Sequence, residues 1–168
     1  RRLDAMLVGR DFEAVLGVSP AIGRVFRADD FRAGSERVAL LTAGFWRREF
    51  GSDPAAVGRT LLLDDKPFEI VGVLPEMPVR FPSAAHEIWV PLIAQPSVFW
   101  QNQRGTGWLT AVARVKPEVS LTAARDELTA IALSLRERYP DSNEHRAGVL
   151  VEPIRESITG DVRPVVLL

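Results

Sequence analysis

The sequence predicts a protein of the α+β class, and three observations lead to that prediction. Strand and helix patterns alternate near both ends of the chain. The middle of the chain is dominated by strand patterns and contains a hairpin signal. Two strand–helix units that share one sheet form a ferredoxin-like arrangement. We therefore expect a ferredoxin-like βαβ lobe from about residues 1–36 and 108–160, with an inserted, mostly β lobe at about residues 37–107.

Two short elements open the first lobe. The apolar run at residues 3–8 is typical of a strand, and residues 10–16 have the pattern of a short helix. Gly17 can take the left-handed conformation that ends such a helix. After a turn at Ser19-Pro20, residues 22–36 are rich in turn formers, and we expect a polar loop there.

The inserted lobe begins with a strand and a helix. Residues 37–42 have the apolar character of a buried strand, and the Thr42 hydroxyl can cap a helix over residues 43–50. Gly51 is placed to end that helix. Asp53-Pro54 is a second start signal, with aspartate at the cap and proline at the first helical position, and it predicts a single helical turn.

Two adjacent aspartates lie between two strongly apolar runs. Residues 59–63 and 68–74 are strand patterns, and we expect a loop of four residues, Asp64 to Pro67, between them. An aspartate carboxylate accepts hydrogen bonds from nearby backbone N–H groups, which makes this residue frequent in turns. We therefore interpret Asp64 and Asp65 as the tip of a β-hairpin and not as a catalytic pair.

A loop-rich segment follows at residues 75–107, with residues 86–92 as its strand candidate. Phe99 and Trp100 lie there among polar residues. Such aromatic side chains either fold back into the core or form an exposed apolar patch. We retain Phe99 and Trp100 as candidate partner contacts.

The last third predicts a long helix between two strands. Residues 109–115 and 147–154 have strand patterns. Between them, Ser120 can cap a helix that runs from residue 121 to about residue 139, where Pro140 stops it. Its apolar residues recur every three or four positions, so we expect one stripe that faces the core.

Composition excludes several classes of function. The 168 residues include 21 lysines and arginines and 22 aspartates and glutamates, and a net charge of −1 gives no electrostatic reason to bind nucleic acid. The absence of cysteine excludes disulfides, thiol nucleophiles and thiolate metal sites. Because the chain starts at Arg1 and stops within an apolar run, we expect it to be a segment of a longer protein.

Candidate catalytic residues are few. The sequence has no Gly-x-Ser-x-Gly elbow and no glycine-rich nucleotide loop, and His86 and His145 each lie in a polar, loop-like setting. The adjacent acids are Asp29-Asp30, Asp64-Asp65 and Asp126-Glu127. Neighbouring residues in a turn or helix do not face each other across a cleft as glycosidase acids do. We therefore predict a non-enzymatic chain with no catalytic residue, metal site or cofactor.

Two alternatives stay open at this point. A carboxylate-dependent hydrolase would need two acids that converge in a cleft. A stand-alone solute-binding module would need a deep, partly apolar pocket between the lobes.

Several segments, in their order along the chain, resemble the extracytoplasmic core domain of MacB-like and FtsX-like ABC transporter permeases, above all the large permeases common in acidobacteria. The segments are residues 11–26, 45–76, 88–92, 112–128, 139–143 and 160–168. Each is weak alone, and the ordered series over nearly the whole chain carries the resemblance. Asp64-Asp65 stands where the family usually has Asn-Gly, and Glu118 where it usually has glycine, so we expect those turns to be strained or of another type.

The resemblance implies a porter-type form of the ferredoxin-like lobe and a position between two membrane helices. Residues 161–168 would then lead into a membrane helix that is absent from this chain. It also implies a location at the periplasmic face of the bacterial inner membrane. Members of the family export drugs, peptides or lipoproteins, or activate cell-wall hydrolases.

The role that the resemblance implies is mechanical. A cytoplasmic ATPase subunit moves the membrane helices, and the paired outer domains transmit the motion to a substrate or partner outside the membrane. The implied partners are a second permease copy in a dimer, the ATPase subunit through the missing membrane helices, and a periplasmic adaptor or substrate.

Overall fold

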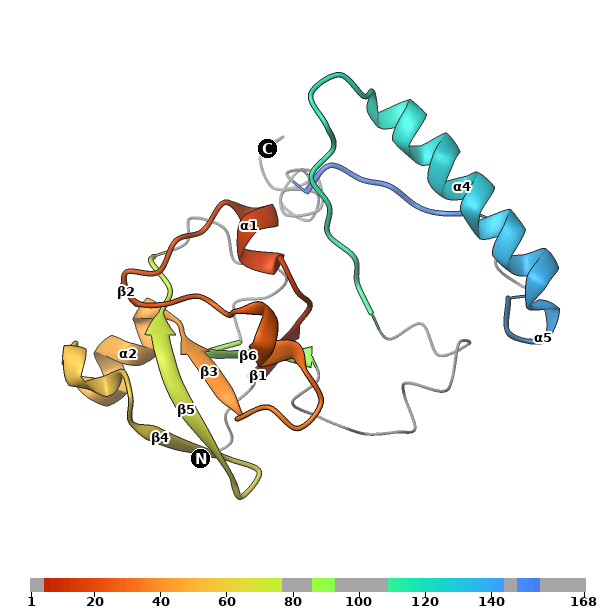
Figure 1. Cartoon of the computed structure of the whole chain (residues 1–168). Helices are drawn as coiled ribbons and strands as arrows, with labels where there is room; N and C mark the ends of the chain where they lie inside the picture. Colours follow the sequence, from red (N-terminus) through yellow and green to blue (C-terminus); the bar gives the residue numbers. More distant parts are fainter. Residues whose placement is uncertain (1–4, 77–85, 93–108, 144–147, 155–168) are drawn as a thin grey trace, which may run out of the picture. The chain divides into compact units, whose positions relative to one another are not determined.

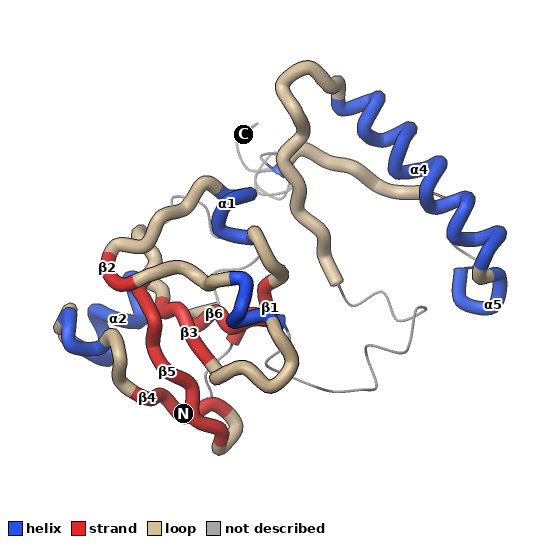
Figure 2. Tube along the Cα trace, viewed as in Figure 1, coloured by secondary structure: helices blue, strands red, loops and turns tan. Residues whose placement is uncertain are grey.

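The computed structural model describes residues 5–76, 86–92, 109–143 and 148–154. The chain divides into two compact units, Arg1–Pro96 and Ser97–Leu168. All strands of the described residues belong to the first unit, and the long helix belongs to the second (Figures 1 and 2). Within these described ranges, no helix combines the length and apolar character that a membrane crossing requires.

One mixed sheet forms the frame of the first unit. In the described residues its spatial order is β1 (Ala5–Val8), β6 (Ile88–Pro91), β3 (Val38–Leu41), β5 (Lys66–Val73) and β2 (Ile22–Gly23), and β4 (Thr60–Leu63) also pairs with β5. The pairs β1–β6 and β3–β5 are parallel, whereas β3–β6, β2–β5 and β4–β5 are antiparallel. This mixed sheet with its helices confirms the predicted α+β class.

Helical segments form near residues 10–16, 43–50 and 54–56, as the sequence signals predict, whereas residues 22–36, which we expected to be a polar loop, contain β2 and a 3₁₀ turn. The helices are α1 (Phe12–Leu16) and α2 (Ala43–Phe50), with two single 3₁₀ turns, η1 (Ala28–Phe31) and η2 (Pro54–Ala56). Thr42 Oγ1 accepts a hydrogen bond from the Phe45 N–H at 3.3 Å, and Gly51 ends α2 with a φ of 59°. Asp53 Oδ1 accepts a bond from the Ala55 N–H at 2.9 Å at the start of η2.

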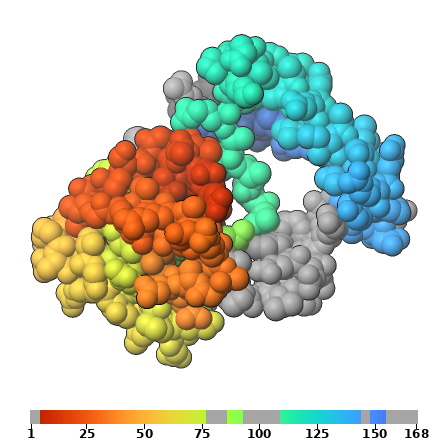
Figure 3. Space-filling model, viewed as in Figure 1, coloured from red at the N-terminus to blue at the C-terminus, as the bar shows by residue number. Residues whose placement is uncertain are grey.

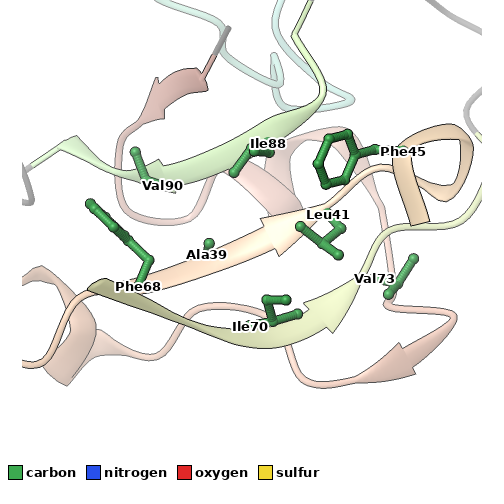
Figure 4. Packing of buried hydrophobic residues seen from close by; sticks show 8 residues of the cluster. All are labelled: Ala39, Leu41, Phe45, Phe68, Ile70, Val73, Ile88 and Val90. Carbon is green, nitrogen blue, oxygen red and sulfur yellow. The ribbon is translucent and has the colours of Figure 1, made fainter. Parts of the chain in front are cut away.

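The first hydrophobic core lies on the sheet face that α2 covers (Figure 4). Its buried members are Ala39, Leu41, Phe45, Phe68, Ile70, Val73, Ile88 and Val90. Phe45 comes from α2 and the others from β3, β5 and β6. Trp46 and Phe50, also from α2, pack against this core. The apolar side of α2 predicted from the sequence is therefore its contact with the sheet.

A second core fills the opposite face. Its buried members are Val8, Phe26, Val38, Leu40, Val71, Leu74 and Trp89. Phe12 and Leu16 of α1 and Phe31 of η1 pack against it, and the Phe12 ring meets Trp89 edge-on at 5.0 Å. In Figure 3 the red and orange residues of the segment from β1 through η1 cover this part of the unit. Because both faces are buried, the central strands read as continuous apolar runs.

A β-bulge in β5 changes which residues of this strand face each side of the sheet. Ala39 of β3 pairs with Ile70, but Leu40 pairs with Gly72, so Val71 is an extra residue in β5. As a result Ile70 and Val73, three residues apart, both face the first core.

β2 approaches β5 closely at this bulge, through a Gly23–Gly72 pair. A Cβ atom on Gly72 would lie 2.4 Å from the Arg24 carbonyl oxygen, and one on Gly23 would lie 2.3 Å from the Val71 carbonyl oxygen. Only glycine fits at either position.

The predicted β4–β5 hairpin is confirmed, with a shorter loop than we expected. Leu63 pairs with Lys66, so the turn consists of Asp64 and Asp65 alone. Both have positive φ, 49° and 59°, as a type I′ turn requires. We expected Pro67 in the loop, but it lies in β5 opposite Leu62. Along an antiparallel ladder, hydrogen-bonded pairs of residues alternate with pairs that are not hydrogen-bonded. The Leu63–Lys66 pair closes the turn, so Pro67 lies in the next pair, where the ladder needs no backbone N–H.

The second unit contains the long helix α4 (Leu121–Arg138) and the short α5 (Pro140–Asn143). Ser120 Oγ accepts a bond from the Ala123 N–H at 3.1 Å, which confirms the predicted cap. The strands that we expected at residues 109–115 and 147–154 are not formed in their described parts. A strand needs a neighbour for its backbone N–H and C=O groups, and sequence pattern cannot supply one.

The lobe division predicted from the sequence separates residues 1–36 from residues 37–107. β1 and β2 lie in the same sheet as β3, β5 and β6, so the boundary that we placed at residue 37 does not divide this sheet. The assignment of residues 108–160 to one lobe with residues 1–36 stays a prediction, as does the role of residues 161–168, which lie outside the described residues.

Candidate functional site

The aspartate pair at the hairpin tip is solvated. Asp64 and Asp65 are both exposed, at the two central positions of the turn. Their carboxylates stand at the end of a two-stranded ribbon. This position suits turn chemistry and gives no second wall against which a substrate could be held.

The pair Asp29 and Asp30 separates into two different environments. Asp29 is exposed and forms an ion pair with Arg32 at 3.1 Å. The Asp30 side chain is 12% exposed and accepts two hydrogen bonds from Arg24, at 2.6 and 3.2 Å, and one from the Arg27 N–H at 2.7 Å. Burial alone would raise the pKa of Asp30, but these bonds outweigh it and hold that pKa below its ordinary value. Asp30 therefore acts as a structural anion that organises η1.

The remaining sequence candidates do not come together in the described residues. Asp126 and Glu127 are exposed on α4. His86 lies just before β6 and is half-buried. His145, Phe99 and Trp100 lie outside the described residues. Phe99 and Trp100 therefore remain candidate partner contacts by prediction alone.

The structure also shows a buried acid that sequence reasoning missed. Glu13 in α1 is 6% exposed, and its Oε1 accepts a hydrogen bond from the Phe26 N–H at 3.3 Å. Burial raises the pKa of Glu13, with Asp11 and Asp30 adding to the effect, while the bonds from backbone N–H groups of Glu13 and Phe26 oppose it. A glutamate in the first turn of a helix is normally a solvated partner of the helix dipole, so no sequence signal marked it.

The arginines of α2 join this helix to the residues that follow β5 and to the residue that precedes β6. Arg47 forms an ion pair with Glu76, and Arg48 contacts Glu49 and Glu87, each at 2.7 Å. The hydrogen bond to Glu49, with a second to Glu87, raises the pKa of Arg48. Arg48 also lies over the Phe45 ring at 5.3 Å. These groups are engaged in holding α2 on the sheet.

Within the residues that the structure describes, no group of three or more histidine, cysteine, aspartate or glutamate side chains is placed to hold a metal ion. The polar side chains of η1, α2 and the hairpin tip stabilise turns, caps and a helix-to-sheet contact. The first unit is thus a mixed-sheet domain with two buried faces.

The fold is similar to the folds of two solved extracytoplasmic domains of ABC-type transporters. The periplasmic region of MacB from Actinobacillus actinomycetemcomitans matches 84% of this chain with a TM-score of 0.57 and 16% identity, and 59% of that structure is covered. The extracellular domain of the ABC-type transporter YknZ from Gram-positive bacteria matches 84% of the chain with a TM-score of 0.55 and 18% identity, and 67% of it is covered.

The sequence match names the family. The model of the MacB-like periplasmic core domain matches residues 2–131, and the chain belongs to this family.

Two relatives are the macrolide export ATP-binding/permease proteins MacB of Chromobacterium violaceum, 34% identical over 96 residues, and of Burkholderia pseudomallei strain 1710b, 29% identical over 127 residues. These alignments cover 57% and 75% of this chain but only 15% and 19% of the two relatives' lengths.

Proposed function

We propose that this chain is the extracytoplasmic domain of an ABC transporter permease and that it works without catalysis, by transmitting ATPase-driven motion to a substrate or partner outside the membrane. The observation that carries the proposal is the family match over residues 2–131 to a periplasmic core domain. The printed names of the two MacB relatives, which describe ATP-binding/permease proteins for macrolide export, support the transporter context.

The packing of the first unit supports a mechanical role. Its sheet is buried on both faces, and the ion pairs of α2 attach the helix to Glu76, which follows β5, and to Glu87, which precedes β6. A close-packed interior resists compression and transmits displacement. A force applied at one part of this sheet would therefore move the unit as one body.

The acids give no comparable support to a hydrolase. In the described residues, Asp64 and Asp65 are exposed at a hairpin tip, Asp30 is engaged by Arg24, and Asp126 and Glu127 lie on an exposed helix. None of these pairs presents two carboxylates across a cleft, which a glycosidase-type mechanism needs.

The proposed partners follow from the transporter context. They are a second permease copy, a cytoplasmic ATPase subunit reached through membrane helices outside this chain, and a periplasmic adaptor or substrate. We propose the periplasmic face of the bacterial inner membrane as the location. Phe99 and Trp100 are the proposed contact residues for such a partner.

The hairpin tip provides a place to measure the motion. This chain has no cysteine, so Asp65→Cys in the complete permease can carry a nitroxide label, with the labelled peptide identified by mass spectrometry. Pulsed electron resonance would give the distance between the labels of two permease copies, with and without ATP trapped by vanadate. We expect the distance distribution to shift on trapping, because the tip is joined to the sheet core through the β4–β5 ladder.

The control is the same label in a complex whose ATPase cannot hydrolyse or trap ATP, where no shift is expected. A distribution that stays unchanged in a complex with normal ATP turnover would contradict the mechanical role.

A further inference from the structure

One segment of the first unit lies on the second core without forming part of a strand ladder. Residues 25–35 connect β2 to β3 and contain η1, and we call them the strap (Figure 1, orange). Phe26 and Phe31 pack on the second core, where their rings meet edge-on at 5.9 Å. In the residues that the structure describes, every backbone–backbone hydrogen bond of the strap joins two of its own members. Side chains therefore hold the strap in place, and such a segment can open while the sheet stays folded.

Polar contacts tie the strap to the segment around α1. The Phe26 N–H donates a hydrogen bond to Oε1 of Glu13 at 3.3 Å, and Nη2 of Arg10 donates one to the Ala28 carbonyl oxygen at 3.3 Å. The contact of Arg10 is exposed, whereas Glu13 and Phe26 are both buried. The bond from Phe26 thus places the buried Glu13 carboxylate directly against the strap.

In the described part of the chain, no arginine or lysine forms an ion pair with Glu13. Both terminal nitrogens of Arg24 bond to Asp30, and Arg27 also acts on Asp30. Arg10 is bonded to a carbonyl oxygen of the strap. The cations near α1 and η1 are therefore engaged elsewhere.

The surroundings of Glu13 are apolar or acidic. The second core contributes apolar side chains only. Burial is the largest cause of the raised pKa of Glu13, and the charges of Asp11, at the start of α1, and Asp30, in η1, add to it. Ionisation of Glu13 beneath the closed strap is therefore costly, because the charge is removed from water without a cation to balance it.

Opening of the strap would return Glu13 to water. Movement of Phe26 removes the bond to Oε1, and the solvated carboxylate then titrates near its ordinary pKa of 4.5. Because the closed form binds this proton more tightly than the open form, the open form is favoured as the pH rises through the closed-state pKa. Well below 4.5, Glu13 is protonated in both forms and the opening equilibrium no longer changes.

We propose that Glu13 and the strap form a proton-controlled latch: the strap is held closed while Glu13 carries a proton and opens more readily once Glu13 is ionised. Opening uncovers Phe26 and Phe31 and leaves the sheet ladders in place. The latch needs only residues of the first unit and does not depend on ATP-driven movement, so failure of the mechanical role leaves it intact.

Backbone amide exchange of the 168-residue chain, followed by NMR between about pH 5 and 8, tests the latch. The reporter is the Phe26 N–H, and the control is the Trp46 N–H of α2, which bonds to the Thr42 carbonyl oxygen at 3.0 Å. Because α2 packs on the first core, its local opening leaves Glu13 buried. Each exchange rate is divided by that of the unfolded peptide at the same pH, which gives the opening constant.

The wild type is compared with Glu13→Gln and Asp11→Asn. In the wild type, the opening constant of Phe26 should rise several-fold with pH and then level off, while that of Trp46 stays constant. Glu13→Gln keeps an acceptor oxygen but cannot ionise, so its Phe26 constant should not change with pH. Asp11→Asn removes one like charge and suits the left-handed backbone there, with a φ of 64°, so the rise should move to lower pH.

Three results would overturn the latch. A Phe26 constant that is independent of pH in the wild type would mean that opening does not solvate Glu13. An equal rise at Trp46 would mean that the strap opens only together with the whole unit. A rise that persists in Glu13→Gln would assign the titration to another group, and if that variant does not fold, an unshifted rise in Asp11→Asn leads to the same conclusion.

Discussion

Asp64 and Asp65 adopt backbone conformations that glycine and asparagine adopt with less strain. Both φ angles are positive, and the left-handed region is unfavourable for a residue with a Cβ atom. Aspartate tolerates it because its short polar side chain bonds locally. Asp64-Asp65 therefore forms the type I′ turn that Asn-Gly favours, and stores strain in it.

Relief of this strain should stabilise the first unit. We expect Asp65→Gly to raise the free energy of unfolding by about 0.5–1 kcal/mol, the usual difference when glycine replaces a strained left-handed residue. Urea unfolding followed by fluorescence would measure it. Asp65→Ala is the control and should lower stability, because alanine keeps the strain and loses the carboxylate. Equal stability of both variants would contradict a positive-φ turn.

Glu13 should make stability depend on pH in a defined direction. Burial raises the pKa of Glu13 above its ordinary value of 4.5, so the folded chain binds this proton more tightly than the unfolded chain. The contribution of Glu13 to the free energy of unfolding should therefore increase as the pH falls through its folded pKa toward 4.5, and stay level below that. It is lost as the pH rises through the folded pKa.

The measurement is urea unfolding of the wild type, of Glu13→Gln and of Asp30→Asn between about pH 2 and 8. Relative to the variant, the wild type should gain stability on acidification. Asp30→Asn gives the opposite case: the pKa of Asp30 is lowered, so its stabilisation is present above 3.8 and lost as the pH falls through its folded pKa. If the free energies of unfolding of the wild type and of Glu13→Gln differ by the same amount at every pH, Glu13 is not a buried acid with a raised pKa.

At the scale of the elements, the contact of β2 with β5 depends on two facing glycines. A Cβ atom on Gly72 would be 2.4 Å from the backbone oxygen of Arg24, an atom that cannot move without shifting β2. We expect Gly72→Ala to lower the free energy of unfolding by about 2 kcal/mol or more, the range of overpacking in a close contact. Chemical denaturation of the whole chain would measure the change.

Gly44→Ala in α2 is the matched control. A Cβ atom there meets nothing within 4 Å, and its φ is not positive. This substitution should be neutral or stabilising by up to about 1 kcal/mol, because alanine is the better helix former. Similar losses in both variants would mean that the loss at Gly72 does not come from its contact with β2.

At the scale of the whole molecule, the distribution of buried residues predicts how the chain divides. Residues 1–96 contain both described cores and Trp89, which is 1% exposed. We expect the fragment of residues 1–96 to unfold cooperatively in urea, with the fluorescence of Trp46 and Trp89 as the readout. The fragment of residues 97–168 should show a gradual loss of helix without a cooperative transition, because none of its described residues is buried.

A cooperative transition in the second fragment alone would show that it holds a core of its own, and an unstructured first fragment would show that its sheet needs residues beyond 96. The whole chain, studied by circular dichroism at the same concentrations, is the reference.

Much of the local structure was predictable because its signals are short in range. The caps at Thr42, Asp53 and Ser120, the glycine stops at Gly17 and Gly51, and the β4–β5 hairpin all follow from residues within a few positions of each other. The interpretation of Asp64 and Asp65 as a turn also came from local chemistry. The family could be identified because an ordered series of such local segments is specific even though each piece is weak.

The tertiary structure decided what depends on residues far apart in the chain. The pairing of β1 with β6, the bulge at Val71 and the burial of Glu13 beside Phe26 have no local signal. A strand pattern states which side chains are apolar and not which backbone lies next to it, and a carboxylate is buried only when another element covers it. Sequence therefore determined the elements and the family, whereas the neighbours of each element in the sheet came from the three-dimensional arrangement.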